Sequence, residues 1–172
     1  MIENSMLYRG RPKNKSDYEF LSKAYPENCK NGFVFGQPLI DKVKNRYYIC
    51  VSLLATMNCT VANGTVTVIE VIPETINRCM ELTDKNGTKF FEGDIVKIIS
   101  LSHDTFYAVV KFGDYNQPDK ILRTHLGFYF DFFNDVNHKC FRKDVGYWTG
   151  HTFCDFEIIG NIYDNQILLK GE

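Results

Sequence analysis

Residues 84–99 read Asp84-Lys-Asn-Gly-Thr-Lys-Phe-Phe-Glu-Gly-Asp-Ile-Val-Lys-Ile-Ile99, and this stretch indicates the fold class. Residues 84–87 and 92–94 are turn sequences, because each supplies a glycine for a left-handed backbone. An apolar run, residues 95–99, follows the second turn at once. Strands joined by turns this short must be antiparallel, since a parallel crossover needs a much longer connection. The stretch therefore predicts a mainly β chain.

The flanking sequence extends this pattern in both directions. Apolar and aromatic side chains alternate with a period of two over residues 106–112, 126–133 and 156–162, which predicts strands. Residues 46–52 and 65–72 are rich in β-branched and aromatic side chains, which suit a pleated sheet. The Asn-Gly pair at 63–64 predicts a hairpin that joins residues 53–62 to 65–72. Residues 113–118 read as a polar loop.

Helical signals are few. Ser16 and Glu19 form a capping-box pattern before apolar residues, so we expect one short helix at residues 16–25. Pro73 suits the first position of a single helical turn. It also marks the division that we expect between two packed lobes, residues 1–72 and 73–172. The helix belongs to the first of these β lobes.

Composition narrows the function classes. The 172 residues carry 20 basic and 21 acidic side chains, and this balance lacks the basic excess of a dedicated nucleic-acid binder. No apolar run has the length of a signal peptide core or a membrane span, so we expect a cytoplasmic protein without a membrane partner. In that compartment we expect reduced thiols at all six cysteines, namely Cys29, Cys50, Cys59, Cys79, Cys140 and Cys154.

One local cluster of cations lies near the N-terminus and comprises Arg9, Arg11, Lys13 and Lys15. We expect a solvated arm here. The alternative is contact with phosphate or an acidic surface.

Catalytic motifs are absent from the sequence, because no nucleotide-binding loop, metalloprotease motif or serine-hydrolase motif occurs. A zinc site would need two histidines and two cysteines, at His138, Cys140, His151 and Cys154. A nucleophilic thiol would need Cys140 or Cys154 beside one of these histidines, with Asp155 as the third group. Carboxylates that could flank a cleft are Asp131, Asp135 and Asp144. None of these spacings favours a metal site or a catalytic group. We therefore expect no catalytic residue, no cofactor, no metal and no enzyme activity.

An aromatic series between residues 126 and 148 is the strongest binding candidate. Its members are Phe128, Tyr129, Phe130, Phe132, Phe133, Phe141, Tyr147 and Trp148. Alternate members of a strand point to opposite faces, so a second layer or a second subunit must cover those that do not enter the core. A stacking surface for peptide, glycan or single-stranded bases is the functional alternative. Whether the series forms an interface or core stays open.

The order of several motifs resembles the YopX family. The chain has Tyr8-Arg-Gly-Arg, Phe33-Val-Phe-Gly, Val71-Ile-Pro-Glu-Thr-Ile, Leu82-Thr-Asp-Lys-Asn-Gly, Phe90-Phe-Glu-Gly-Asp-Ile-Val and Phe156-Glu-Ile-Ile-Gly-Asn-Ile-Tyr-Asp-Asn. The resemblance implies a phage or prophage origin and a mainly β architecture of small barrel-like lobes, without an established catalytic activity. The Glu92-Gly-Asp-Ile-Val block resembles a strand entry of an SH3-like barrel, which we expect in the C-terminal lobe.

The expected function is protein contact without catalysis. We expect a homo-oligomer or a complex with an unidentified phage or host protein. The alternative is a nucleic-acid-associated accessory protein that uses the N-terminal cations and exposed aromatic side chains.

Overall fold

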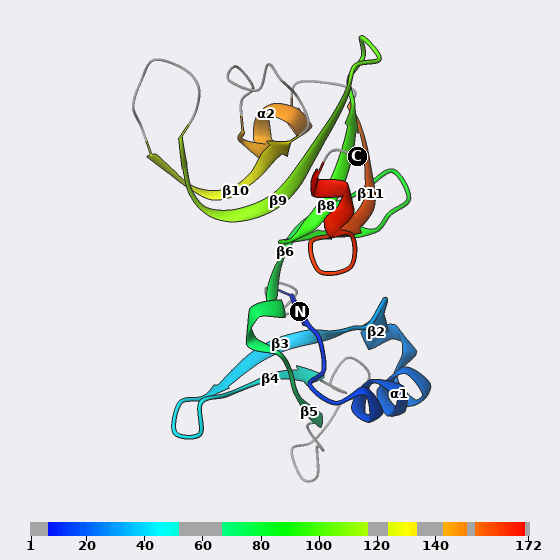
Figure 1. Cartoon of the computed structure of the whole chain (residues 1–172), viewed down its shortest axis with the longest axis vertical. Coiled ribbons are helices and arrows are strands. Elements are labelled where there is room, and N and C mark those ends of the chain that lie inside the picture. The colour runs from blue at the N-terminus through cyan, green and yellow to red at the C-terminus, as the bar shows by residue number, and fades with distance from the viewer. Residues whose placement is uncertain (1–6, 52–66, 117–123, 134–142, 151–153, 171–172) are drawn as a thin grey trace, which may run out of the picture. The chain divides into compact units, whose positions relative to one another are not determined.

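A computed structural model describes residues 7–51, 67–116, 124–133, 143–150 and 154–170 (Figure 1). Strands predominate, and neighbouring strands in the described residues pair antiparallel, so the mainly β prediction is confirmed. The chain forms two compact units, Met1–Cys79 and Met80–Glu172. Pro73, where the sequence suggested a division, begins the 3-10 turn η3 (Pro73–Thr75) within the first unit.

The first unit is built on the long strand β3 (Phe33–Asp41). Strand order is β5-β4-β3-β1-β6, and β2 also pairs with β3. The other strands are β1 (Tyr8–Gly10), β2 (Cys29–Lys30), β4 (Arg46–Val51), β5 (Thr67–Glu70) and the start of β6 (Asn77–Thr83). The N-terminal half of β3 pairs with β1 and its C-terminal half with β4. At this change of partner a Cβ on Gly36 would lie 2.1 Å from the carbonyl oxygen of Cys50, so only glycine fits.

Helix α1 (Lys15–Ala24) confirms the predicted N-terminal helix within one residue at each end. The capping-box prediction is wrong, because the N-cap is Asn14 and not Ser16. Asn14 Nδ2 instead donates to Asp17 Oδ2 at 3.2 Å. The helix contributes Leu21 to a core that also contains Val34, Ile49, Val51, Ile69 and Val71. A 3-10 turn, η1 (Pro26–Asn28), follows the helix.

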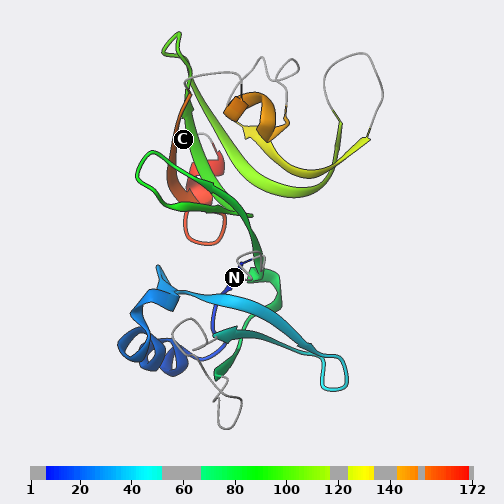
Figure 2. The same cartoon turned by 180° about the vertical axis from the view of Figure 1, so that it is seen from behind.

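The second unit contains a four-stranded sheet in the order β10-β9-β8-β11. These strands are β8 (Asp94–Ile99), β9 (Thr105–Asn116), β10 (Thr124–Phe133) and β11 (Asp155–Asn161). Strand β7 (Lys89–Phe91) pairs with β6. Helix α2 (Val145–Gly150) and the 3-10 helix η5 (Gln166–Lys170) complete the unit. Strands β9 and β10 curve around α2, which lies on their concave side (Figures 1 and 2).

One face of this sheet makes the core of the second unit. The buried residues of this core are Phe90, Val96, Ile98, Ala108, Val110, Phe130 and Trp148, of which Phe90 comes from β7 and Trp148 from α2. On β9 and β10 they share even numbers, as expected from the period-two alternation of the sequence. Sequence periodicity missed α2, because its six residues are too few to show a helical period.

One further prediction needs correction. Residues 113–116 were expected in a polar loop, yet they continue β9 and pair with Thr124–Gly127 of β10. The SH3-like barrel is not confirmed, because no sheet closes among the described residues. Of the predicted hairpin over 53–72, residues 53–62 and the Asn-Gly pair lie outside the described residues. Its second half includes β5, which pairs with β4.

Candidate functional site

The predicted basic arm is largely part of the first unit's structure. Arg9 is buried, and its guanidinium lies 4.4 Å from the centre of the Phe33 ring. The guanidinium of Arg11 lies 4.7 Å from the same ring centre. Such cation–π contacts stabilise buried guanidinium groups. Lys13 and Lys15, whose side chains are 61% and 90% exposed, match the solvated arm that the sequence suggested, although Lys13 also pairs with Glu70.

Buried polar residues after β5 form hydrogen bonds to Arg9 and Arg11. The backbone N–H of Arg11 donates to Thr75 Oγ1 at 2.8 Å, and that hydroxyl donates to the carbonyl of Ile72 at 2.7 Å. Arg9 Nε lies 3.5 Å from Asn77 Oδ1. Thr75 and Asn77 are both buried. The polar residues around η3 therefore fix β1 and the residue that follows it in place.

Asp84 organises the first turn of the second unit. Its Oδ1 accepts hydrogen bonds from the N–H groups of Asn86 and Thr88 at 2.9 and 2.8 Å. Its Oδ2 accepts from the N–H of Ile158 at 3.3 Å. Burial opposes its charge, yet these backbone donors hold the pKa of Asp84 below its ordinary value. The carboxylate therefore ties β11 to the turn between β6 and β7.

Asp94 and the closing residues of β11 play similar parts. Asp94 is buried, and its Oδ2 accepts the N–H of Phe91 at 2.8 Å across the turn at Gly93. Gly93 has a φ of +84°, which favours glycine. Asn165 Oδ1 accepts the N–H of Asn161 at 3.1 Å and lies where a Cβ on Gly160 would be. These residues hold turns.

The aromatic series divides between two faces of the β9–β10 hairpin. Phe130 is fully buried and stacks on Phe156, with ring centres 5.8 Å apart. Trp148 packs on Phe132, with ring centres 5.3 Å apart. These members form core, while Phe141 lies outside the described residues. The opposite face carries Tyr129 and Phe133, both half-buried.

Three rings form a row on that opposite face. Tyr115 stacks between His125 and Tyr129, with ring centres 5.4 and 4.9 Å apart. The ammonium of Lys143 lies 5.8 Å from the Tyr129 ring centre. Tyr115 and Tyr129 are half-buried and His125 is exposed. We call His125, Tyr115 and Tyr129 the aromatic row.

The aromatic row lies where the hairpin bends. Gly113 and Gly127 are directly paired, with φ angles of +150° and +158° that other residues rarely adopt. Glycine pairs allow a sheet to bend sharply, and aromatic rings often cover them. Beyond this bend Leu126 is 73% exposed. The distal hairpin thus presents apolar groups on both faces, since Leu126 and Tyr115 point to opposite sides.

The outer edge of β10 is paired along only part of its length. The N–H of Phe130 donates to the carbonyl of Lys143 at 2.9 Å, and Tyr129 bridges Asp144. From Thr124 to Phe128, the backbone groups on the outer edge of β10 have no hydrogen-bond partner among the described residues. The open edge of β10 and the aromatic row together form the candidate site. Because it offers aromatic rings and backbone groups that are unpaired within the described ranges, it is a candidate surface for binding another molecule.

A family model described as YopX protein matches residues 3–170 of the chain. The chain belongs to the YopX family. No curated protein matches it. The YopX match covers both compact units, so the candidate surface on β10 lies within the part of the chain that defines the family.

The geometry gives the YopX motifs of this chain structural roles. The Tyr8-Arg-Gly-Arg and Phe33-Val-Phe-Gly motifs meet where the two guanidinium groups cover Phe33. Gly10 packs against Val71, where a Cβ would meet the side chain at 3.2 Å. The later motifs supply Asp84 and Asp94 to turns, and Gly160 to β11 where Asn165 packs against it. The family signature is therefore a set of folding constraints in this chain.

The residues that the sequence offered for a metal site or a nucleophilic thiol lie only in part among the described residues. His138, Cys140, His151 and Asp135 lie outside the described residues. Cys154 is a free, half-buried thiol against the core of the second unit, and Asp155 is exposed. Among the described residues no group of three metal-binding side chains gathers. The described helices include none that is long and apolar enough to cross a membrane.

The remaining carboxylates form structural contacts. Asp131 accepts hydrogen bonds from Lys111 and from Lys143. Burial opposes its charge, but the two ammonium groups hold the pKa of Asp131 below its ordinary value. Asp144 Oδ1 accepts the N–H of Tyr147 at 2.7 Å at the start of α2.

Tyr115 is the member of the candidate site that sequence reasoning missed. It lies in a polar segment that was read as a loop, so its ring was not counted with the aromatic series. The signal that could have found it is Gly113, which faces Gly127 in the β9–β10 hairpin. Glycines in facing strands indicate a bend that a neighbouring ring can cover.

Proposed function

We propose that this YopX-family chain is a non-enzymatic protein of phage or prophage origin that acts through protein–protein contact, with a second copy of itself as partner. The observation that carries the proposal is the open outer edge of β10 beside the aromatic row. Two such edges can pair antiparallel about a two-fold axis, which makes one surface complementary to itself.

The backbone geometry fits this pairing. Because the N–H of Phe130 points to the outer edge, those of Phe128, Leu126 and Thr124 point the same way in a strand with period two. These groups have no backbone partner within the described residues. A second β10 would satisfy them and extend the four-stranded sheet into the partner.

The side chains of β10 offer no protection against such pairing. Natural edge strands are usually blocked by charged residues or proline. Between residues 124 and 133 the only charged residue is Asp131, and it is held by two lysines. An exposed Leu126 beside half-buried aromatic side chains favours association over exposure to water.

The non-enzymatic part of the proposal rests on how the motif carboxylates are used. Asp84 and Asp94 accept backbone hydrogen bonds within turns, so their oxygens are committed to structure. The phage or prophage origin rests on the family resemblance. Phage genes on both sides of the coding sequence would support that origin, and a chromosomal housekeeping operon would contradict it.

The test is the molar mass of the full chain in solution, measured by size-exclusion chromatography with light scattering over a range of concentrations. We expect about twice the chain mass of 20.0 kDa for the wild type. Leu126→Lys places a charge at the open edge and should give the monomer. Leu126→Pro removes an outward N–H that β9 does not use, and it should have the same effect.

A matched control separates the edge from general surface change. Leu101 is also exposed, at 60%, but lies outside β10, so Leu101→Lys should leave the dimer intact. A wild-type monomer at every concentration, or a Leu126→Lys dimer, would reject self-association through β10. Binding of a labelled single-stranded oligonucleotide that is lost on Tyr115→Ser and weakens with salt would instead favour the nucleic-acid alternative.

A further inference from the structure

The turn between β3 and β4 in the first unit exposes apolar side chains without any role in the core. Leu39 is 52%, Ile40 is 51% and Val43 is 94% exposed. Leu39 and Ile40 are neighbours in β3, so they point to opposite faces of the hairpin. The turn lies at the end of the first unit that is opposite α1 (Figures 1 and 2). We call residues 39–46 the hairpin end.

The hairpin end has a fixed backbone. Asp41 Oδ1 accepts hydrogen bonds from the N–H groups of Val43 and Lys44, both at 3.0 Å. Asn45 has a φ of +50°, a conformation that asparagine tolerates better than most residues. Side-chain hydrogen bonds of this kind define tight turns. A partner that binds here therefore meets an ordered turn and loses little free energy to ordering it.

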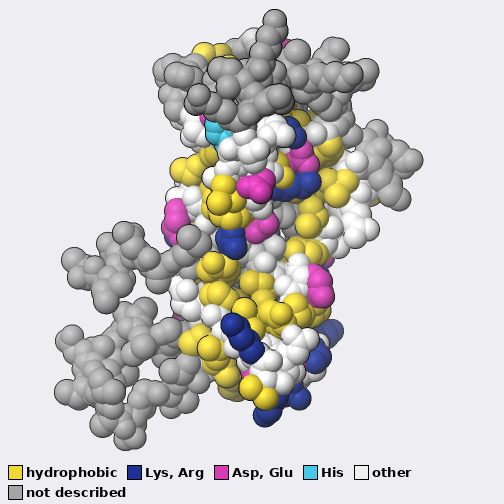
Figure 3. Space-filling view, turned by 90° about the vertical axis from the view of Figure 1, so that its left-hand side faces the viewer, with side chains coloured by type: hydrophobic (Ala, Val, Ile, Leu, Met, Phe, Trp, Pro, Cys, Tyr) yellow, Lys and Arg dark blue, Asp and Glu magenta, His cyan; other side chains and the backbone are white. Residues whose placement is uncertain are grey.

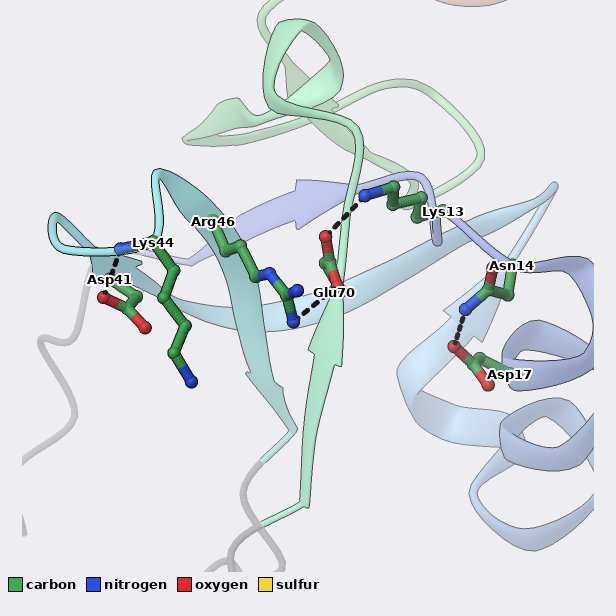
Figure 4. A network of polar contacts seen from close by, with 7 residues as sticks. All are labelled: Lys13, Asn14, Asp17, Asp41, Lys44, Arg46 and Glu70. Carbon is green, nitrogen blue, oxygen red and sulfur yellow. Dashed lines mark hydrogen bonds and ion pairs between the residues drawn. The ribbon is translucent and has the colours of Figure 1, made fainter.

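Cations outnumber carboxylates around the hairpin end. Lys42, Lys44 and Arg46 belong to it, and Lys13 lies beside it (Figure 4). Glu70 bridges two of them, 2.7 Å from Lys13 Nζ and 3.9 Å from an Arg46 nitrogen. The hydrogen bond from Lys13, aided by Arg46, holds the pKa of Glu70 below its ordinary value.

The remaining cations face solvent. Lys42 and Lys44 are exposed and make no ion pair in the described part of the chain. Asp41, the second carboxylate, is turned toward the backbone of the turn (Figure 4). The net field of the hairpin end is therefore positive, on a chain whose overall charge is −1.

A hollow of about 170 Å³ adjoins the hairpin end. Its polar lining includes Lys13, Arg46 and Glu70, and its apolar lining includes Tyr47, Ile72 and Pro73. Ile72 is itself 39% exposed. The lower part of Figure 3 shows hydrophobic side chains gathered among lysine and arginine side chains on this side of the first unit.

We propose that the hairpin end and the adjoining hollow bind an acidic segment of a partner protein that also carries aliphatic side chains. Carboxylates of the segment would lie by Lys44 and Arg46, and aliphatic groups would cover Val43 and Ile72. A phosphate backbone would satisfy the cations but would leave these apolar groups in water. A flat lipid surface would not fill a hollow that charged and apolar side chains line together.

The surface differs from the β10 edge in place and in chemistry. It belongs to the first unit, while β10 belongs to the second. Self-association and capture of an acidic segment can therefore fail independently. The Leu126→Lys variant should keep the binding described here.

The experiment is selection of peptides from a random library on the immobilised full-length chain, followed by measurement of the selected peptides by fluorescence anisotropy. We expect enrichment of aspartate and glutamate together with leucine, isoleucine or valine. Binding should weaken as salt is raised, because the charges are exposed. Lys44→Glu should weaken it by roughly tenfold, since a like charge then faces the peptide. Val43→Ser should weaken it by about threefold to fivefold.

Lys30→Glu is the matched control. It makes the same charge change on β2 of the same unit at an exposed position, and it should leave binding unchanged within about twofold. Enrichment of basic or uncharged peptides would overturn the proposal, as would equal losses for Lys30→Glu and Lys44→Glu. Vesicles of anionic lipid or a labelled oligonucleotide that bind through Lys44, in the absence of peptide binding, would assign the surface to another partner class.

Discussion

The two long hairpins of this chain expose apolar groups in different settings. β3–β4 ends in a hydrogen-bonded turn with three cations and aliphatic side chains on both faces. β9–β10 bends at a glycine pair and carries a row of stacked rings with one charged residue in β10. Both belong to antiparallel sheets whose inner faces build a core.

The difference indicates two ways in which one chain can meet partners. Cations around an aliphatic turn favour a partner of opposite charge, because complementary fields give specificity. An uncharged strand edge favours a copy of itself, because backbone pairing needs no charge complement. Substitutions in the core, at the bends and at the exposed ends of the two hairpins should therefore differ in their effects.

The largest effect is expected at the base of β9–β10. Phe130 is fully buried between Phe132 and Phe156, so Phe130→Ala should lower the free energy of unfolding by about 3–5 kcal/mol through lost burial and a cavity. Urea unfolding followed by fluorescence measures it. The only tryptophan of the chain, Trp148, packs in the same core and reports on this unit.

The corresponding change on the other hairpin should be small. Leu39 is half-exposed at the hairpin end, so Leu39→Ala should cost less than about 1 kcal/mol, measured by far-ultraviolet circular dichroism. Similar losses for the two variants would mean that the exposed end of β3–β4 is packed in solution, which would also remove the binding surface proposed there.

The two glycine positions should rank next. Gly36→Ala should cost about 3 kcal/mol, because the new Cβ meets a backbone carbonyl in β4 that cannot move away. Gly113→Ala has open space and strains only the backbone, at φ +150°, so about 1–2 kcal/mol is expected. Urea unfolding of both variants, by circular dichroism and by Trp148 fluorescence, checks the order. A larger loss for Gly113→Ala would show that its bend is tightly packed.

Much of the fold could be predicted from residues with local signals. Alternation in residues 106–112 and 126–133 gave β9 and β10, and Gly87 and Gly93 marked real turns. Pro73 began a helical turn as expected. These features depend on neighbours in sequence, so a single chain reveals them.

The candidate surfaces depended on pairings between distant residues. Gly113 and Asn116 were predicted in a loop. They belong to a strand because they pair with residues in β10 that are distant in sequence. Arg9 read as a solvated cation, because the ring that covers it comes from β3. The exposed hairpin end was not singled out, since Leu39 and Ile40 look like core residues until the sheet shows which strand ends project. Long-range contact decided each of these cases.

Acid should act on the β9–β10 hairpin through Asp131. Its pKa is lowered in the folded state, so its contribution is present above the unfolded pKa of about 3.9 and is lost as pH falls through the lower folded value. Asp131→Asn should cost roughly 1 kcal/mol or less at pH ~7, after allowance for solvent screening, and almost nothing at pH ~2. Urea unfolding at the two pH values measures the difference. Asp114→Asn, at an exposed carboxylate on β9, is the control, and an equal pH dependence there would contradict the role of the two lysines.

The smallest effect is expected at the turn of β3–β4. Asp41→Ala removes the acceptor for two N–H groups in an exposed turn, so it should cost about 0.5–1 kcal/mol. Amide hydrogen exchange should speed up at Val43 and Lys44, while the buried Ile49 of the adjoining strand keeps its protection. Asp41→Asn retains a side-chain oxygen acceptor and should restore most of the protection. If Asp41→Ala leaves exchange at both amides unchanged, the turn is not held by Asp41. The low ordering cost inferred for binding at this turn would then lose its physical basis.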